Sequence, residues 1–252
     1  MTAALLEIEE ATRRFGGLVA VNEVSTHVAE GELVGLIGPN GAGKTTLFNL
    51  ISGFTPLTSG RVRYRGRDIT GLKSHQIGRL GIARTFQNLR VFPNMSVFDN
   101  VSVGATGAVG LPFFRAVAGG RRRSDAISRR SLAALERVGL VAQADDLAAN
   151  LAYGKRKYLE IARALAMHPD LLILDEPAAG LNESETAELA AFIRSLRDEG
   201  LTVMLVEHDM ALVMSICERV VVLASGQKIA DAPPDAVRRD PAVLEAYLGV
   251  DE

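Results

Sequence analysis

Several features of secreted, membrane-spanning and nucleic-acid-binding proteins are missing from this sequence. The chain has one cysteine, Cys217, which excludes an internal disulfide framework and is typical of a reducing compartment. No run approaches the roughly 18 consecutive apolar residues of a membrane span, and the N-terminal residues turn acidic too early for a secretory signal. The formal net charge of −2 provides no overall basic field for nucleic acid. We therefore expect a cytoplasmic protein that does not bind nucleic acid.

The composition is otherwise that of an ordinary globular protein. Hydrophobic residues make up 48% of the 252 residues, and charged residues make up 23%. This length is enough for one large α/β domain, or for a core with a smaller appended lobe. The sequence contains no internal repeat and no long low-complexity segment.

A glycine-rich stretch, GPNGAGKT at residues 38–45, matches the pattern G-x-x-x-x-G-K-[ST] of a phosphate-binding loop. The apolar residues before it, 33–37, are typical of a buried parallel strand, and apolar residues after it recur at helical spacing. Glycines allow backbone N–H groups to converge on phosphate oxygens, and a helix N-terminus adds partial positive charge. The predicted nucleotide-binding residues are Gly38, Pro39, Asn40, Gly41, Ala42, Gly43, Lys44, Thr45 and Thr46.

Two side chains of this loop have specific predicted roles. Lys44 is expected to reach the β- and γ-phosphates, and the hydroxyl of Thr45 is expected to ligate Mg²⁺. The alternative is a glycine-rich turn that binds nothing. The complete motif in a strand–loop–helix context favours phosphate binding.

Two carboxylates follow a second apolar strand at residues 171–174. Asp175 is placed to hold Mg²⁺, directly or through water, and Glu176 is placed to polarise an attacking water as a general base. A solvated acidic turn would be the better interpretation if the phosphate-binding loop were absent. Together with that loop, the pair predicts nucleotide hydrolysis.

Two further polar residues are candidates for the same chemistry. His208 follows a third apolar strand, residues 202–206, at the edge where α/β proteins bind ligands, and it could sense the γ-phosphate. Gln87 could offer its amide oxygen to Mg²⁺ or to the attacking water. The alternatives, a structural histidine and a polar loop residue, stay open on the sequence alone.

In this order the motifs resemble an ATP-binding subunit of an ABC transporter over essentially the full chain. The resemblance implies an α/β fold with a P-loop (RecA-like) ATPase core, an antiparallel β-subdomain and an inserted helical subdomain. It also implies that Phe15 stacks on adenine with Val21 nearby, and that ATP and Mg²⁺ are bound. Two segments would complete the site of a partner subunit in trans: the signature residues Leu151, Ala152, Tyr153, Gly154 and Lys155, and a D-loop ending in Asn182.

Longer stretches resemble one subgroup, the ATP-binding proteins of branched-chain amino-acid importers. The matching stretches are GIARTFQNLRVFPNMSVFDNV, DEPAAGLN, EHDM and AYLG. This resemblance implies several partners: a second ATP-binding subunit, membrane permease subunits and, indirectly, a periplasmic binding protein. It places the chain at the cytoplasmic face of the membrane. Similar relatives serve urea, amides and other amino acids, so the transported substrate stays open.

The signature departs from the general family pattern, Leu-Ser-Gly-Gly-Gln. Only Leu151 and Gly154 match it, because Ala152, Tyr153 and Lys155 replace the other three residues. Since Ala152 has no hydroxyl to offer a γ-phosphate, we expect a heterodimer with unequal sites, provided that the partner carries an intact signature.

The motifs divide the chain into three parts. Residues 1–86 and 155–252 are expected to form the nucleotide-binding core with its β-subdomain, and residues 87–154 a helical subdomain. Within the latter, five arginines between residues 121 and 130 favour a solvated loop that leads into a helix over a contact with lipid headgroups. Residues 104–120 mix glycine with apolar side chains and predict either a mobile loop or a partner contact.

Two other functions are compatible with a phosphate-binding loop. A soluble ABC-type ATPase that is not coupled to a transporter usually fuses two cassettes or carries long coiled coils, and neither is present here. A small-molecule kinase would not require Glu176 directly after Asp175, and no acceptor-binding lid is evident. The sequence therefore favours a transport ATPase.

Overall fold

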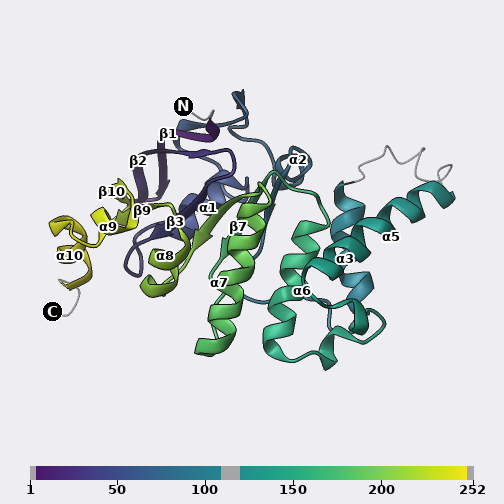
Figure 1. Ribbon diagram of the computed structural model, residues 1–252. Helices are drawn as coiled ribbons and strands as arrows, with labels where there is room; N and C mark the ends of the chain where they lie inside the picture. The colour runs from purple at the N-terminus through teal and green to yellow at the C-terminus, as the bar shows by residue number, and fades with distance from the viewer. Residues whose placement is uncertain (1–3, 109–119, 249–252) are drawn as a thin grey trace. The chain divides into compact units, whose positions relative to one another are not determined.

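The computed structural model describes residues 4–108 and 120–248, which form two compact units (Figure 1). The segments Met1–Ile77 and Ile173–Glu252 make the first unit, and Gly78–Leu172 makes the second. No helix among the described residues is long and apolar enough to cross a membrane.

A mainly parallel central sheet is the core of the first unit. Its strands lie in the order β10 (Gln227–Ala232), β9 (Arg219–Ala224), β3 (Leu33–Ile37), β8 (Thr202–Val206) and β7 (Leu171–Asp175). β3 pairs in parallel with both β8 and β9, whereas β10 is antiparallel to β9. Every residue of β3, β7 and β8 is buried, as expected for strands covered on both faces. The strands predicted at 33–37 and 202–206 are therefore confirmed.

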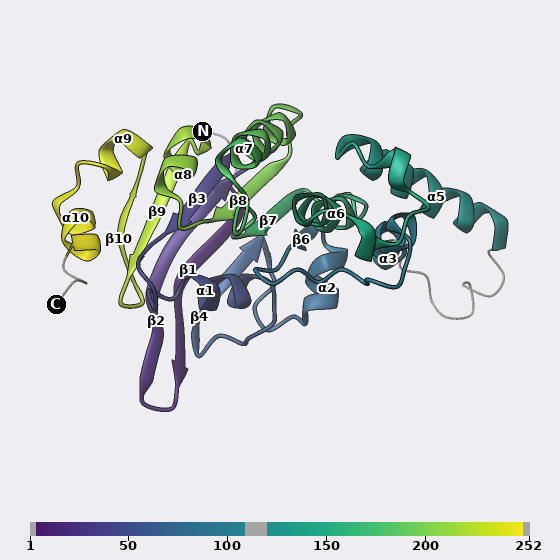
Figure 2. The ribbon, with the colours of Figure 1, turned by 90° about the horizontal axis from the view of Figure 1, so that it is seen from below.

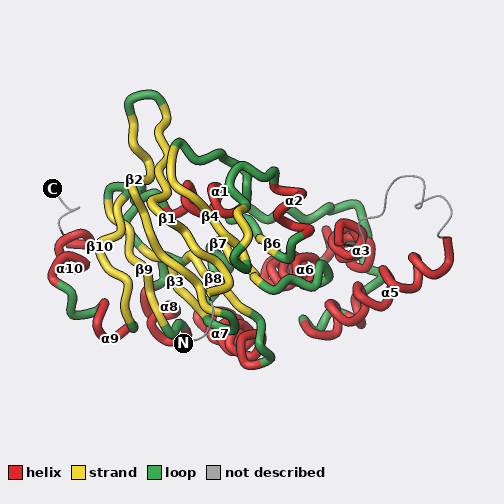
Figure 3. The backbone as a smooth tube through the Cα atoms, turned by 90° about the horizontal axis from the view of Figure 1, so that it is seen from above, coloured by secondary structure: helices red, strands yellow, loops and turns green. Residues whose placement is uncertain are grey.

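Helices cover both faces of this sheet. Helix α1 (Lys44–Ile51) lies on one face, and α7 (Glu183–Asp198) and α8 (Met210–Ile216) lie on the other (Figures 2 and 3). Two short helices, α9 (Pro234–Val237) and α10 (Pro241–Leu248), follow β10. Both α9 and α10 begin with proline, whose fixed φ suits the first turn of a helix.

An antiparallel sheet completes the first unit. Its order is β2 (Leu18–Ala29), β1 (Ala4–Phe15), β4 (Ser59–Tyr64) and β5 (Arg67–Asp68). β1 and β2 form a long hairpin that projects from the rest of the sheet (Figure 2). The turn contains Gly16, whose positive φ of 58° suits a residue without Cβ. This sheet is the antiparallel β-subdomain that the sequence predicts.

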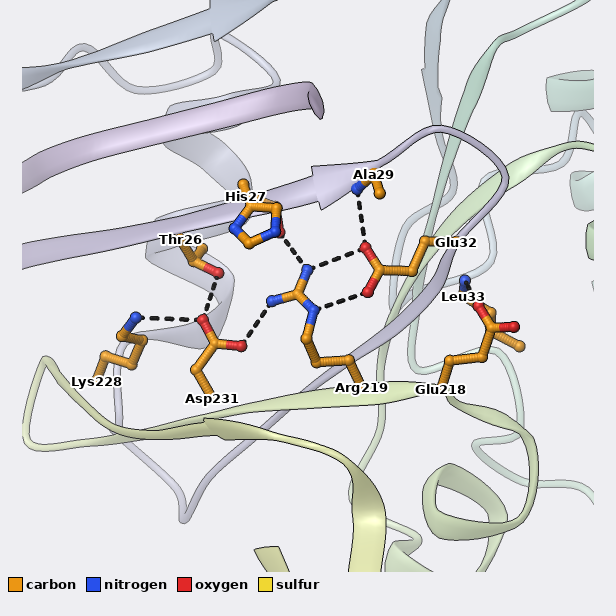
Figure 4. Close-up of polar contacts among 9 residues, drawn as sticks. All are labelled: Thr26, His27, Ala29, Glu32, Leu33, Glu218, Arg219, Lys228 and Asp231. Carbon is orange, nitrogen blue, oxygen red and sulfur yellow. Dashed lines mark hydrogen bonds and ion pairs between the residues drawn. The ribbon is translucent and has the colours of Figure 1, made fainter. Parts of the chain in front are cut away.

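Arg219, the first residue of β9, connects the two sheets of the first unit (Figure 4). Its Nε and Nη2 atoms donate to both carboxylate oxygens of Glu32, at 2.7 and 3.0 Å. Its Nη1 atom donates to Oδ1 of Asp231 at 2.6 Å, and Nη2 also donates to the carbonyl oxygen of His27. Oδ2 of Asp231 accepts a further bond of 2.9 Å from the hydroxyl of Thr26. Although burial raises the pKa of Asp231, the bonds from Arg219 hold it below its ordinary value.

Replacing Arg219 with methionine is expected to lower the free energy of unfolding by about 3 kcal/mol, because Glu32 and Asp231 would stay mostly buried without their shared cation. For a chain of this size, the midpoint of thermal unfolding should then fall by about 6–12 °C. The control is Arg61→Met, which removes an exposed ion pair with Asp68 and should leave the midpoint unchanged. Equal midpoints in the two variants would contradict a stabilising role for Arg219.

The second unit is mainly helical. It contains β6 (Ile82–Arg84), α3 (Val97–Ala108), α5 (Gly120–Arg137) and α6 (Tyr153–Leu165), with 3₁₀ turns at Val141–Gln143 and Ala148–Asn150. α3 packs against both α5 and α6. Gly104 allows the close approach of α3 to α6, since a Cβ there would lie 2.0 Å from the carbonyl oxygen of Arg163. The buried side chains of this core include Val101, Leu135 and Leu159.

The second unit is larger than the predicted helical subdomain of residues 87–154. It begins at Gly78 and ends at Leu172, because α6 packs on α3 and α5 and so belongs with them. Motif order predicts a boundary between residues 154 and 155, but this point lies within the first turn of α6, which is one continuous helix.

The expectation of a loop at the arginine cluster is wrong for the backbone. Residues 120–137 form one continuous helix, α5, of 18 residues. Ser131, Ala134 and Leu135 make its buried face, and such a stripe favours a helix over a loop. Of the segment 104–120, residues 104–108 continue α3, and residues 109–119 lie outside the described part of the chain.

Candidate nucleotide-binding and active site

The loop at residues 38–43 joins β3 to α1 and requires glycine at specific positions. Gly38, Gly41 and Gly43 have φ values of 151°, 79° and 98°, which L-residues with side chains rarely adopt. A Cβ on Gly38 would lie 2.1 Å from the carbonyl oxygen of Leu223, and one on Gly43 would lie 2.4 Å from that of Ala20. The loop is therefore seated directly against backbone, and larger residues would displace it.

The donor set of this loop fits an anion. The first-turn N–H groups of α1 have no acceptor within the helix, and the helix N-terminus carries partial positive charge. The loop itself is fixed by two backbone hydrogen bonds: Ala42 N–H donates to the Pro39 carbonyl at 3.2 Å, and Gly226 N–H donates to the Ala42 carbonyl at 3.1 Å. A phosphate group would meet donors that are already in position.

Lys44 is the only buried cation of this loop. Its Nζ donates to the carbonyl oxygens of Gly38 and Pro39, at 2.6 and 3.0 Å. Burial lowers the pKa of its ammonium group, while the carboxylates of Glu176 and Asp175 counteract that shift. The lysine is thus held against the loop by backbone carbonyls and faces an acidic environment.

The other predicted loop residues differ in their accessibility. Asn40 and Thr45 are exposed, Pro39 and Thr46 are half-buried, and Ala42 is buried beneath the loop. The exposed Thr45 near the start of α1 is accessible to a phosphate-bound cation, and the buried Ala42 makes backbone hydrogen bonds with Pro39 and Gly226.

The two predicted carboxylates end β7 and are both buried. Asp175 is the last residue of the strand, and Glu176 follows with a φ of 49°, an uncommon value for a residue with a side chain. The N–H of Glu176 donates to the Val206 carbonyl on the neighbouring strand at 2.9 Å. Such a backbone conformation costs about 1–3 kcal/mol and clusters at functional sites.

His208 and Glu176 are brought together by the pairing of β7 with β8. The Nε2 atom of His208 lies 2.7 Å from Oε1 of Glu176, although the two residues are 32 apart in the chain. The imidazole is 46% exposed and the carboxylate 11%, so the histidine approaches a largely buried carboxylate from the solvent side. This arrangement orients the carboxylate that is predicted to polarise water.

Glu207 is a buried residue of this region that sequence reasoning did not assign. Its Oε1 accepts the Ala178 N–H at 2.7 Å, and its Oε2 accepts the N–H of His208 at 3.2 Å. Burial raises the pKa of Glu207, although these two N–H groups stabilise its charged form. The available signal was a glutamate directly after the apolar run 203–206. Its hydrogen bonds fix the turns that carry Glu176 and His208.

The residues predicted to contact adenine lie in different environments. Phe15 ends β1 and is 46% exposed, with the Arg13 guanidinium carbon 4.5 Å from its ring centroid. Val21 is completely buried, and its Cγ2 would lie 3.4 Å from a Cβ on Gly43. The side chain of Val21 therefore supports the loop from beneath rather than lining an accessible surface.

The remaining predicted site residues serve local structure as well. Asn182 caps α7 through a capping box, in which its side chain accepts the Glu185 N–H at 3.0 Å and its own N–H donates to the Glu185 carboxylate at 3.0 Å. In the second unit, Gln87, Ala152 and Lys155 are exposed, Gly154 is half-buried and Leu151 is buried. Tyr153 begins α6 and is 47% exposed, with the Lys157 ammonium 5.8 Å from its ring centroid.

The residues at the carboxyl ends of β3 and β7 fit a nucleotide with Mg²⁺. Mg²⁺ is usually held by one or two carboxylates, a hydroxyl and the phosphates of the substrate, and not by a cage of protein ligands. Asp175 and Thr45 supply a carboxylate and a hydroxyl of that kind. No cluster of three or more His, Cys, Asp or Glu side chains that could hold a metal occurs in the described ranges.

Comparison with known proteins decides the family. A model of the ABC transporter family matches residues 21–179, more than half of the chain. The chain belongs to the ABC transporter ATP-binding family. A second model, described as a branched-chain amino acid ATP-binding cassette transporter, matches residues 227–252. The cassette thus carries both the general motifs and a C-terminal segment typical of one subgroup.

Full-length relatives share this assignment. The cassette is 45% identical over 259 residues to the high-affinity branched-chain amino acid transport ATP-binding protein LivG of Salmonella typhimurium, and 46% identical over 254 residues to BraF of Pseudomonas aeruginosa, with 99% of each chain covered in both cases. It is also 36% identical to the lipopolysaccharide export system ATP-binding protein LptB of Acidithiobacillus ferridurans, over 97% of each chain.

Solved structures of related cassettes have the same fold. A nucleotide-free ATP-binding cassette of an ABC transporter superposes with a TM-score of 0.86 at 29% identity, covering 97% of this chain and 99% of that one. The ADP conformation of another ATP-binding cassette gives 0.86 at 30% identity, covering 98% and 100%. The predicted fold class, the ABC-type transport ATPase and the subgroup resemblance are confirmed, while the roles of individual residues stay predictions.

Proposed function

We propose that this cassette is the ATP-hydrolysing subunit of an importer for branched-chain amino acids, held by permease subunits at the cytoplasmic face of the membrane. The observation that supports hydrolysis best is the 2.7 Å contact of His208 with Glu176, in the unit that also holds Lys44 in its glycine loop. The C-terminal family match and two relatives named for branched-chain amino acid transport support the substrate.

In the proposed mechanism the loop and Lys44 bind the β- and γ-phosphates of ATP. Glu176 then accepts a proton from the attacking water, and His208 holds the Glu176 carboxylate in position. Mg²⁺, when bound, would neutralise phosphate charge, and Thr45 and Asp175 would hold it. Gln87 in the second unit stays a predicted ligand of the same ion.

The proposed working form is a pair of cassettes that closes around ATP, each supplying its signature segment to the other. Ala152, which offers no hydroxyl, would close the partner's nucleotide site less tightly than a serine would. A hydrogen bond to a charged group contributes about 1.5–3 kcal/mol. We therefore expect unequal sites in a heterodimer whose partner has an intact signature.

Ala152→Ser is expected to raise ATP turnover at the partner's site by about 10-fold or more, through the added hydrogen bond. It is measured in the reconstituted complex in which this chain carries Glu176→Gln, so that the partner's site is the one observed. Ala152 is also the N-cap of α6 and makes no side-chain cap bond, so serine should additionally stabilise the isolated chain. A higher melting temperature without any change in turnover would mean that the altered signature is functionally neutral.

Uptake in cells tests the substrate. The chain is expressed with its permease subunits, partner cassette and periplasmic binding protein, and accumulation of labelled leucine, isoleucine and valine is compared with that of urea and a short amide. The proposal is supported if the cells take up the three amino acids and if Glu176→Gln abolishes this uptake. If the cells take up only urea or the amide in an ATP-dependent manner, the proposed substrate is wrong, whereas the proposed ATPase function stands.

A further inference from the structure

A small pocket of about 230 Å³ lies in the second unit, and all of its lining residues belong to that unit. It is lined by residues of β6, α3 and α6, and the two helices lie side by side in Figure 2. Sites for drug-sized ligands occupy roughly 300–1,000 Å³. The volume of this pocket therefore suits a smaller ligand.

Glu160 of α6 gives the pocket a buried acceptor. The residue is 3% exposed, and its Oε1 atom is buried without a hydrogen-bond partner in the described structure. The carboxylate accepts backbone hydrogen bonds from Arg90 and Phe86, whereas Oε1 has only an ion pair with Nη2 of Arg163 at 3.6 Å, which is too long for a hydrogen bond. Because a buried carboxylate oxygen without a donor is costly, this atom indicates a ligand that donates, such as an ammonium group.

Two arginines supply the opposite charge. Arg163 also lines the pocket, and its Nη1 atom donates to the Arg90 carbonyl, which fixes the guanidinium in place. Arg84 of β6 lines the same pocket, and its guanidinium carbon lies 5.4 Å from the centroid of the Phe86 ring. Guanidinium groups held in this way are typical binding groups for a carboxylate.

The rest of the wall is apolar or small. Val103 is 43% exposed although it is apolar, and Met167 can adapt its thioether to the shape of a ligand. Gly107 leaves room, because a Cβ there would have no heavy atom within 4 Å. A ligand could therefore place an aliphatic group against this wall.

We propose that this pocket binds a free α-amino acid with an aliphatic side chain, with its ammonium group on Glu160, its carboxylate on Arg84 and Arg163, and its side chain against Val103 and Met167. The choice of leucine as the probe rests on the proposed transport function. The pocket itself does not, since its chemistry comes from Glu160 and the two arginines. Glu160 is seven residues beyond Tyr153, so the ligand is bound about two helical turns from the signature segment.

Methyl NMR of the full chain tests the proposal directly. The six methionines are labelled at their ε-methyl groups, and Met167→Leu identifies the signal from the pocket. L-leucine is expected to shift this signal saturably with a Kd of about 1 mM or lower. 4-Methylpentanoate, which lacks the ammonium group, and 3-methylbutylamine, which lacks the carboxylate, should each bind about 10-fold more weakly or worse.

Three variants separate the pocket from general effects. Glu160→Gln should weaken L-leucine binding by about 10-fold or more, and Gly107→Leu should abolish it by filling the space without touching Glu160. Glu188→Gln makes the same chemical change on the exposed surface of α7 and should leave binding unchanged. Unchanged melting temperatures establish that the variants are folded.

Two results would overturn the proposal. The first is that the Met167 signal shows no saturable shift even at L-leucine concentrations well above about 1 mM. The second is that leucine and both analogues bind with equal affinity. Failure here and failure of the transport function are distinguishable. Binding is measured on the isolated chain, whereas uptake is measured in cells. If the chain drives leucine uptake but leucine does not shift the Met167 signal, the pocket proposal is wrong and the transport proposal stands. If leucine binds the pocket but the complex transports another solute, the proposed transport substrate is wrong and the pocket proposal stands.

Discussion

Lys44→Ala is expected to reduce ATP turnover by about 10²–10³-fold, the loss typical of removing one preorganised charged donor from an active site. Nucleotide binding should weaken as well, because the β- and γ-phosphates lose their cation. The structure adds a second cause. Nζ of Lys44 donates to the carbonyl oxygens of Gly38 and Pro39, so the variant also removes the bonds that hold the start of the loop. Calorimetric titration with ATP and ADP, together with phosphate release, measures both effects.

A matched control distinguishes the local role of Lys44 from a general loss of positive charge. Lys73→Ala removes an exposed lysine of the same unit and should leave ATP binding and turnover unchanged. If Lys44→Ala hydrolyses ATP at a rate close to that of the unmodified chain, the phosphate-binding role of the loop is wrong.

Glu176→Gln is expected to lower hydrolysis by about 10²-fold or more while ATP binding persists. The amide keeps the size of the side chain but cannot accept a proton from water. Bound ATP should then hold the variant together with its partner cassette, which light scattering detects as an ATP-dependent increase in mass. Retained ATP affinity with lost turnover separates this variant from Lys44→Ala, which should lose both.

The contact between His208 and Glu176 allows a sharper test. If the histidine acts by orienting the carboxylate, His208→Ala should lower turnover in the unmodified chain but cause no further loss in Glu176→Gln. Additive losses would mean that the two residues act independently. The control is Glu188→Gln, an exposed glutamate on α7 whose loss should not change turnover.

The local elements of the nucleotide-binding core could be predicted from the sequence. Short runs made almost entirely of apolar residues predict strands covered on both faces, and β3 and β8 occupy the expected positions. The loop could also be predicted, because glycines spaced before Lys44 serve phosphate binding in a strand–loop–helix context. In each case the decisive interactions connect residues that are close in the chain, so the local sequence pattern is enough to predict the element.

Helical packing could not be predicted in the same way. The arginine-rich run at 121–130 favours a solvated loop by its charge, yet Ser131, Ala134 and Leu135 bury one face of α5 and extend the helix through it. α6 belongs to the second unit because it packs on α3, whose Gly104 permits the approach. Tertiary burial overrides the local charge pattern here.

The sequence by itself determined the family, the fold class and the residue types needed to bind and hydrolyse ATP. Only the tertiary structure decided which of them meet. Glu176, which follows β7, contacts His208, which follows the neighbouring strand β8. Arg219 connects Glu32 with Asp231. Glu160 lines a pocket that no sequence motif indicates. The physical reason is that such contacts depend on which strands and helices are neighbours, and that order arises from the packing of the whole unit. Spacing along the chain specifies a helix or a strand, but not its neighbours in space.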